Sequence, residues 1–275
     1  MKKQIMVCAD DYAQNDAISE GIRCAIRARR INAVSCLTTA PSWMRAGAAL
    51  RQMQSDCLVG LHLNLTWGQA SSIAWQKHYG LLFKALPIII LASYLKRLNP
   101  QILMAECRAQ LELFRRVMGR DPDFIDGHQH VHQLPVVRDV LCALYQNEQL
   151  TSFVRSTVSG VQKTGFPKAQ LIACLGGVTC KRILQAFGIP INTSFSGVYP
   201  FRCAPRYRHY FKHFLSASED RGLIMCHPGI VSSDTHDPLH ASRHHELAYL
   251  MSAAFLDDLD AYAFTLHVSG KQVTL

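Results

Sequence analysis

Short apolar runs alternate with longer segments of helical periodicity along most of this chain. The apolar residues 5–8 precede a helical segment to about residue 29, which Asn15 or Asp16 would cap. The alternation predicts further strands at residues 33–39, 58–65, 124–126, 153–155, 189–192, 222–226 and 263–268, a loop at 66–78, and helices at 46–54, 82–98, 101–118, 135–146, 169–174, 180–187 and 244–255. This order indicates an α/β protein with a parallel sheet that is closed or nearly closed into a barrel. No linker rich in Pro, Gly or Ser interrupts the pattern, so we expect residues 1–275 to form a single domain.

Four of the predicted strands end in side chains that bind metals or transfer protons. Asp10 and Asp11 follow the first strand, and His62 lies near the end of the third. His128 comes just after residues 124–126, and His227 follows residues 222–226. Because the carboxyl ends of parallel strands meet at one edge of a sheet, we expect these residues to converge. The pattern predicts a metal-dependent hydrolase.

Asp11, His62 and His128 form a plausible set of three metal ligands, which leaves a coordination position open for water. One carboxylate and two imidazoles suit Zn²⁺, Mn²⁺, Fe²⁺ or Co²⁺, and tolerate Mg²⁺ less well. Neighbouring residues of a strand face opposite ways, but a bend at the strand end would let Asp10 also reach the site and act as a general base. His227 is placed to donate a proton to a leaving amine.

Other polar residues near these strand ends have supporting roles in this interpretation. Asp126 can orient a ligand histidine through its second ring nitrogen. If the strand continues, His130 and His132 lie on the same face as His128, and we expect a second-shell or substrate role for one of them, with a structural role as the alternative. Arg155 also ends a strand and is predicted to bind substrate or to orient the acids.

Composition narrows the function classes. The chain has a formal charge of +9, but no run of Lys and Arg alternates with aromatic residues, so we expect no nucleic-acid partner. None of the ten cysteines forms a C-x-x-C pair, which fits a reducing compartment and a cytoplasmic protein. The apolar segment 81–95 is too short to span a bilayer. We interpret it as a buried or lid helix, with a homodimer surface or membrane contact as alternatives.

The chain resembles the YdjC-like carbohydrate deacetylase family, which includes chitooligosaccharide deacetylases and the hopanoid-biosynthesis deacetylase. The resemblance covers nearly the whole chain and is carried by Ala9-Asp10-Asp11-Tyr12, Gly60-Leu61-His62, Asp126-Gly127-His128-Gln129-His130-Val131-His132 and His227-Pro228. It implies a distorted (β/α) barrel of the polysaccharide-deacetylase-like type and one divalent metal ion, Mg²⁺ or Zn²⁺. It also implies Asp11, His62 and His128 as metal ligands, Asp10 as base and His227 as acid.

One position departs from the family motif. The family usually has Asp-Asp-Phe-Gly, whereas this chain has Tyr12-Ala13 after the two acids. Tyr keeps the ring, but Ala replaces Gly comfortably only where the backbone avoids a positive φ. Residues 156–222 match no motif. Residues 236–245 contain four histidines, which form either a second metal site or a polar loop that leads into a helix.

The resemblance implies that the protein removes an N-acetyl group from an acetylated amino sugar or short oligosaccharide. Three aromatic residues near His62 are candidates for stacking on sugar rings or for packing: Trp67, Trp75 and Tyr79. Two alternatives remain open. One is an amidohydrolase-like enzyme that hydrolyses another amide or ester, which ligation by both His128 and His130 would favour. The other is a metal- or glycan-binding protein without turnover.

Overall fold

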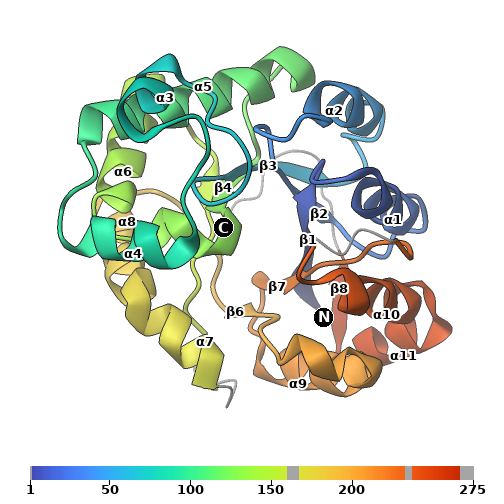
Figure 1. The fold of residues 1–275 in the computed structure, drawn as a ribbon. Coiled ribbons are helices and arrows are strands. Elements are labelled where there is room, and N and C mark those ends of the chain that lie inside the picture. The colour runs from blue at the N-terminus through green and yellow to red at the C-terminus, as the bar shows by residue number, and fades with distance from the viewer. Residues whose placement is uncertain (1, 160–166, 233–236, 267–275) are drawn as a thin grey trace.

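The computed structural model describes residues 2–159, 167–232 and 237–266 and is built around one curled parallel sheet (Figure 1). Its strands lie in the order β5-β4-β3-β2-β1-β7-β6, and β8 pairs with the first residues of β1. Every ladder is parallel. The strands are β1 (Lys3–Tyr12), β2 (Ala33–Cys36), β3 (Leu58–Leu63), β4 (Phe124–Gly127), β5 (Phe153–Val154), β6 (Phe195–Ser196), β7 (Gly222–Cys226) and β8 (Phe264–Leu266).

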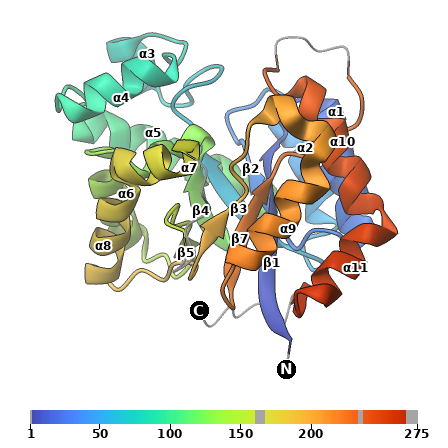
Figure 2. The ribbon, with the colours of Figure 1, turned by 90° about the horizontal axis from the view of Figure 1, so that it is seen from below.

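Helices surround the outside of the sheet (Figures 1 and 2). They are α1 (Asp16–Arg27), α2 (Trp43–Arg51), α3 (Ile73–Tyr79), α4 (Leu86–Tyr94), α5 (Pro100–Met118), α6 (Val137–Glu148), α7 (Pro167–Ile172), α8 (Val178–Ala186), α9 (Tyr207–Ala217), α10 (His240–Met251) and α11 (Ala253–Ala261). Local sequence sets several of their ends. The Asn15 side chain accepts the Ile18 N–H at the start of α1, and Gly119 ends α5 in the left-handed conformation.

The predicted α/β class and barrel-like curvature are confirmed, and the barrel is incomplete. The edge strands β5 and β6 do not pair along their length. Instead, Val154 forms an isolated parallel bridge with Ile191. The predicted strand at residues 189–192 is therefore wrong, because the paired strand of this region is β6. The predicted loop at 66–78 is also wrong, since Ser72 caps the short helix α3 within it. Helix α9 lies in the segment 156–222 that matched no motif.

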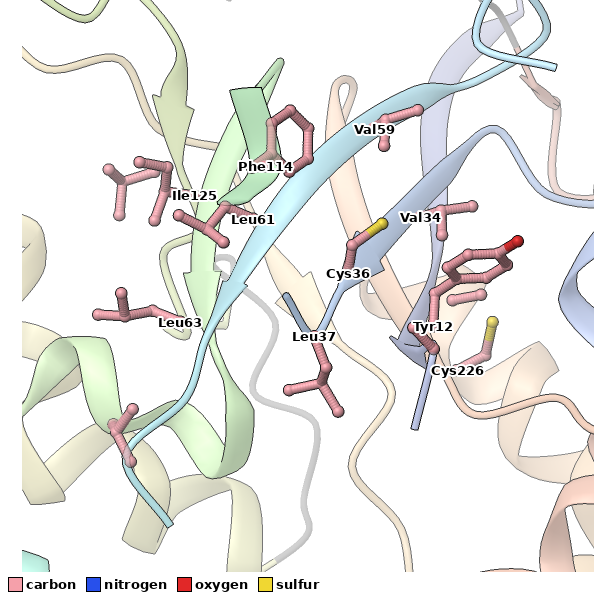
Figure 3. Close-up of a cluster of buried hydrophobic side chains, with 14 of the residues drawn as sticks. Tyr12, Val34, Cys36, Leu37, Val59, Leu61, Leu63, Phe114, Ile125 and Cys226 are labelled. Atoms are coloured by element: carbon pink, nitrogen blue, oxygen red, sulfur yellow. The ribbon is translucent and has the colours of Figure 1, made fainter. Parts of the chain in front are cut away.

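Alternation along the strands divides the buried side chains between the two faces of the sheet. Val34, Val59 and Ile125 point toward the helices and pack in the cluster that includes Phe114 of α5 (Figure 3). A separate buried cluster lies on the concave face, where the rings of Phe124 and Phe153 stack with their centroids 5.1 Å apart. Apolar side chains thus fill part of the interior of the curl.

Candidate functional site

A β-bulge near the end of β1 brings two consecutive carboxylates to the same cavity. Ala9 pairs with Val34 and Tyr12 pairs with Cys36, so β1 carries one extra residue between these pairs. Asp11 lies within this bulge and has a φ of 68°. Regular strand geometry would turn Asp10 and Asp11 to opposite faces, whereas here both line one cavity.

The cavity lies where the strand-end residues converge and has a volume of about 390 Å³. Six of the sequence-predicted site residues contribute to its lining, and five of them are candidate ligands or catalytic residues: Asp10, Asp11, His62, His128 and His227. His130 also lines it, whereas Asp126, His132 and Arg155 lie behind this surface in the fully buried interior. The residues predicted from four separate strand ends therefore do meet in one place.

His62 is held at the end of β3 by groups on neighbouring strands. Its Nδ1 lies 2.6 Å from Asp126 Oδ1 and 2.9 Å from the Ser35 hydroxyl, while its Nε2 lies 3.5 Å from Asp11 Oδ1. A carboxylate on one ring nitrogen fixes the tautomer and leaves the other nitrogen to face the cavity. This is the usual arrangement of a metal-binding histidine.

Asp11, His62 and His128 form a compact group of potential ligands. One ligand atom from each lies within 4.8 Å of the others. Asp11 Oδ1 is 3.0 Å from His128 Nδ1, and Asp11 Oδ2 accepts a hydrogen bond of 2.9 Å from Arg243. Burial alone would raise the pKa of Asp11, but Arg243 and the two imidazoles outweigh it and hold that pKa well below its ordinary value. The Asp11 carboxylate is therefore anionic throughout the neutral range.

The electrostatics of His62 fit a cation site. Burial disfavours the charged imidazole, but the carboxylates of Asp126 and Asp11 outweigh this effect and raise the pKa of His62 to about 10. The pair of acids around the ring thus attracts positive charge, and the proton on Nε2 must leave when a metal ion takes that position. One carboxylate and two imidazoles are a donor set that divalent transition ions accept.

Arg155 fills a second cluster of acidic groups below the cavity. Its guanidinium makes a bidentate pair with Asp10, with both N–O distances 2.6 Å, and its Nη2 also lies 2.6 Å from Asp126 Oδ2. The same nitrogen donates to Cys8 Sγ at 3.1 Å. Cys8, Asp10 and Asp126 lie close enough together to hold a metal ion, but the guanidinium already occupies the space among them. Arg155 therefore fixes both acids and lies too deep to bind substrate.

The histidines after His128 do not continue the strand. The strand β4 ends at Gly127, and residues His128–Gln133 form a 3₁₀ helix in which Gln129 and His130 have positive φ angles. His128, His130 and His132 therefore do not lie on one face of a continuing strand. His132 is completely buried and bonds the Arg155 carbonyl through Nε2, and burial lowers its pKa to about 4. His130 lines the cavity, but it is not one of the described residues that group with Asp11.

A second wall of the cavity is formed by the segment after β7 and by α10. His227 turns its ring against Phe201, with the centroids 5.4 Å apart, and its backbone N–H donates to Glu246 Oε2 at 2.6 Å. The other Glu246 oxygen accepts from the Tyr199 hydroxyl at 2.6 Å. Glu246 is fully buried, and burial raises its pKa above the ordinary value. The Glu246 carboxylate thus holds the backbone of His227 in place.

A close approach of backbones further fixes this wall. A Cβ at Gly21 of α1 would lie 2.6 Å from the Cα of Gly229, so any larger residue would push the segment after His227 away. The Gly229 N–H also donates to the carbonyl of Arg243. Helices α1 and α10 therefore both position the turn that carries His227.

The three candidate stacking aromatics have different environments. Trp67 lines the cavity. Trp75 is almost completely buried and packs against Tyr79 and Phe83, so it is a packing residue and is not available to a sugar. The Tyr79 hydroxyl accepts the Asn99 N–H at the start of α5. Of the three, Trp67 is the one that can face a ligand.

Sequence inspection missed three charged residues of the far wall. Arg243 bonds Asp11 and is itself held by Asp237, with Nε 2.6 Å from Asp237 Oδ2, and Glu246 holds His227. Arg243 and Glu246 lie three residues apart on the buried face of α10 together with Tyr249 and Leu250. The sequence signal that could have revealed them is the presence of two charged residues on the otherwise apolar face of a helix. His240 starts this helix, and His236 lies outside the described residues.

Comparison with known proteins establishes the family. Residues 4–261 match the model of the YdjC-like proteins, so the chain belongs to this family. It is 32% identical to a mouse carbohydrate deacetylase over 149 residues, which are 52% of this chain and 47% of that protein. It is 28% identical to a chitooligosaccharide deacetylase of Yersinia enterocolitica over 137 residues, which are 50% of this chain and 53% of that protein. The chain thus spans about half the length of these curated relatives.

Two solved structures support the fold. An Enterococcus faecalis protein whose name proposes cellobiose-phosphate cleavage superposes with a TM-score of 0.73 over 97% of both chains, at 18% identity. A peptidoglycan N-acetylglucosamine deacetylase superposes with a TM-score of 0.52 over 96% of this chain and 86% of its own, at 11% identity. The curled parallel sheet is therefore a fold shared with polysaccharide deacetylases.

Proposed function

We propose that this protein is a metal-dependent hydrolase that removes the N-acetyl group of an acetylated amino sugar or short oligosaccharide. The observation that carries this proposal is the group of Asp11, His62 and His128 in the same cavity as a second carboxylate, Asp10, and an imidazole on the far wall, His227. Hydrolysis of an amide needs an activated water, a base and an acid for the leaving amine, and the cavity offers residues for each of these tasks. Membership of a family with relatives named carbohydrate deacetylase supports the substrate class.

In this proposal Asp11, His62 and His128 hold one divalent ion, with Zn²⁺ and Mg²⁺ as the first candidates. When bound, the ion supplies Lewis-acid activation of a water molecule and of the acetamide carbonyl. Asp126 aligns His62 for this task because it holds the ring through Nδ1. Arg243 keeps Asp11 anionic and turns its Oδ1 toward the two imidazoles.

Asp10 is the proposed general base. Arg155 holds both of its oxygens from below, which orients the carboxylate. Each oxygen retains a lone pair with which to take a proton from the attacking water, and Asp10 reaches the cavity beside Asp11. In this scheme Arg155 acts through Asp10 and Asp126 and does not touch the substrate.

His227 is the proposed general acid. It lines the cavity from the end of β7, the strand next to β1, and its Nδ1 bonds to no described residue. Protonation of the departing nitrogen by His227 would release a free amino sugar and acetate. Glu246 holds the main chain at His227 and thereby sets the distance of the ring from the substrate.

The cavity also suits a sugar of limited size. A volume of about 390 Å³ matches a small-molecule site, and Trp67 offers a ring face for stacking. All ten cysteines are free thiols, which supports action in a reducing compartment such as the cytoplasm.

Acetate release tests the proposal. Protein stripped with a chelator would be assayed on N-acetylated monosaccharides and chitooligosaccharides, with Mg²⁺, Mn²⁺, Co²⁺, Ni²⁺ or Zn²⁺ added back singly and bound metal measured in parallel. We expect metal-dependent acetate release from at least one sugar. Bound metal with acetate release from none of these sugars would contradict the proposal. Hydrolysis of other amides or esters would then favour the amidohydrolase-like alternative, and glycan binding without hydrolysis would favour a binding protein.

A further inference from the structure

The helices α3 and α4 carry an unusual share of exposed apolar side chains. Seven of the fifteen large apolar side chains that are exposed in the described part of the chain lie between residues 73 and 95. On α4, Ile88, Leu91 and Leu95 follow one another at spacings of three and four residues and so form one stripe, 50–60% exposed, while Ile89 on the other face is buried. Leu81 and Leu82 extend the stripe along the connection from α3. Exposed apolar patches of this kind mark an interaction site.

The charged side chains of the segment that carries this stripe are all of one sign. Residues 57–105 contain four cationic side chains and no Asp or Glu. The four are exposed, and none of them forms an ion pair with another residue that the structure describes: Lys77, Lys84, Lys96 and Arg97. An apolar stripe whose own segment carries only cations complements a surface that is apolar inside and anionic at its edge.

The stripe lies beside the proposed active site. Leu86 at the start of α4 and Trp67 before α3 both line the catalytic cavity. Helices α3 and α4 project at the end of the molecule toward which the strands run (Figure 2). A surface that binds the outer face of α4 would therefore be held close to the mouth of the cavity.

We propose that the α4 surface, formed by Leu81, Leu82, Ile88, Leu91 and Leu95 with Lys84, Lys96 and Arg97, docks onto an anionic lipid bilayer. Interfacial helices combine an apolar face with Lys and Arg residues and lie in the plane of the headgroups. No helix among the described residues is long and apolar enough to span a membrane, so the docking is peripheral.

A second copy of the chain is a poorer occupant of this surface. A symmetric contact would bring the four cations of residues 57–105 toward the same four cations of the partner, with no acid in that segment to compensate them. Phosphatidylserine headgroups supply the missing negative charge, and the acyl region accepts the Ile and Leu side chains.

Vesicle co-sedimentation tests the docking without reference to catalysis. The full-length protein would be mixed with vesicles of phosphatidylcholine and phosphatidylserine in equal amounts, or of phosphatidylcholine alone, at low and high salt. We expect binding to the anionic vesicles that weakens with salt. Lys84→Glu with Lys96→Glu should weaken it at least tenfold, since each cation near an anionic surface contributes about fivefold. Ile88→Ser with Leu91→Ser should weaken it at any salt concentration.

Matched controls keep the result interpretable. Lys212→Glu on α9 and Leu256→Ser on α11 change exposed residues on the side of the molecule away from α3 and α4 (Figure 2), and they should leave binding unchanged. Thermal unfolding would verify that each variant is folded. Absence of vesicle binding, or binding that the α4 variants do not reduce, would overturn the proposal. So would a wild-type dimer that the Ile88→Ser, Leu91→Ser protein fails to form, because the surface would then be an interface between copies. None of these outcomes bears on acetate release.

Discussion

The two walls of the cavity are built in different ways. On one wall, Asp11, His62 and His128 come from the ends of three parallel strands of the sheet, β1, β3 and β4, and each reaches the cavity because its strand stops there. On the other wall, His227 follows β7, but the side chain that holds its backbone, Glu246, comes from the helix α10. The first wall is a product of sheet topology, whereas the second depends on how a helix packs across the sheet edge.

This difference assigns the two walls different tasks. The strand-end wall collects carboxylates and imidazoles that attract a cation to His62, while Arg243 of α10 contributes most to keeping Asp11 ionised. The helix-borne wall positions the proposed proton donor, His227, through the bond between Glu246 and the backbone of His227. Substitutions on the two walls should therefore separate metal binding from catalysis.

The largest expected effects come from one alanine substitution on each wall. His128→Ala should weaken metal binding by at least about a hundredfold and abolish measurable acetate release, because it removes one of three ligands. His227→Ala should retain the metal and lose turnover by about 10²–10⁴-fold, because only the acid is removed. Equilibrium metal binding and acetate release would be measured on both proteins. Loss of the metal from the His227→Ala protein would show that the walls are not separable.

Asp10→Asn tests the base on the strand-end wall. Arg155 still pairs with Asp126 in this variant, so the protein should fold and bind metal, with turnover reduced about 10²–10⁴-fold. Some loss of stability is expected because a buried charge pair is weakened. Near wild-type turnover with full metal content would remove Asp10 from the role of base.

Glu246→Gln tests the positioning of the helix-borne wall. Turnover should fall about 10- to 100-fold with metal content unchanged, because the His227 ring loses its fixed distance from the substrate. The stability of the wild-type protein also has a defined pH dependence at Glu246. The folded-state pKa of Glu246 is raised, so the folded chain binds more protons than the unfolded chain above the ordinary glutamate pKa of 4.5. Wild-type stability should therefore fall as pH rises from this value toward the folded-state pKa.

Urea unfolding at several pH values measures this slope, which the Gln variant should lack. Glu148→Gln is the matched control, because hydrogen bonds from Arg115 and Arg108 lower the pKa of Glu148. Its contribution has the opposite sign, being present above pH 4.5 and lost as pH falls. A Glu246→Gln protein with the wild-type slope would contradict the account of this wall.

The smallest effect concerns the loop that carries Asp11. Ala13 stands where the family usually has Gly, and it has a φ of 75°, which is the condition under which Ala is strained. Ala13→Gly should stabilise the fold by about 0.5–1 kcal/mol, after allowance for the extra freedom of Gly in the unfolded chain. Thermal unfolding would measure it. Unchanged or lower stability would mean that the loop accommodates Ala13 without strain.

Much of the strand-end wall could be predicted from the sequence, because a polar residue after a short apolar run marks the end of a buried parallel strand. The bulge that turns Asp10 and Asp11 to one cavity could not, since an extra residue in a ladder depends on the partner strand. The 3₁₀ turn at His128 was missed for a related reason. An alternating H-x-H-x-H pattern fits a strand equally well, and the positive φ angles of Gln129 and His130 leave no mark in the sequence.

Most of the helix-borne wall could not be predicted from the sequence. Arg243 and Glu246 belong to a helix whose start was predicted four residues late. The local sequence also does not indicate that the charged residues of this helix face the edge of the sheet. The short helix α3 was missed because seven residues carry too little periodicity to distinguish a helix from a loop. Its neighbour α4 was expected as a buried or lid helix, yet it presents a largely exposed apolar stripe.

The most direct test of the central claim is a titration of one divalent metal into chelator-treated protein, with acetate release from an N-acetylated sugar followed at each point. The account predicts that activity is absent at the start and rises in proportion to occupancy, up to one ion per chain, with a proton released as His62 is ligated. Full activity in the metal-free protein, or saturation of the site without acetate release from any acetylated sugar, would contradict it.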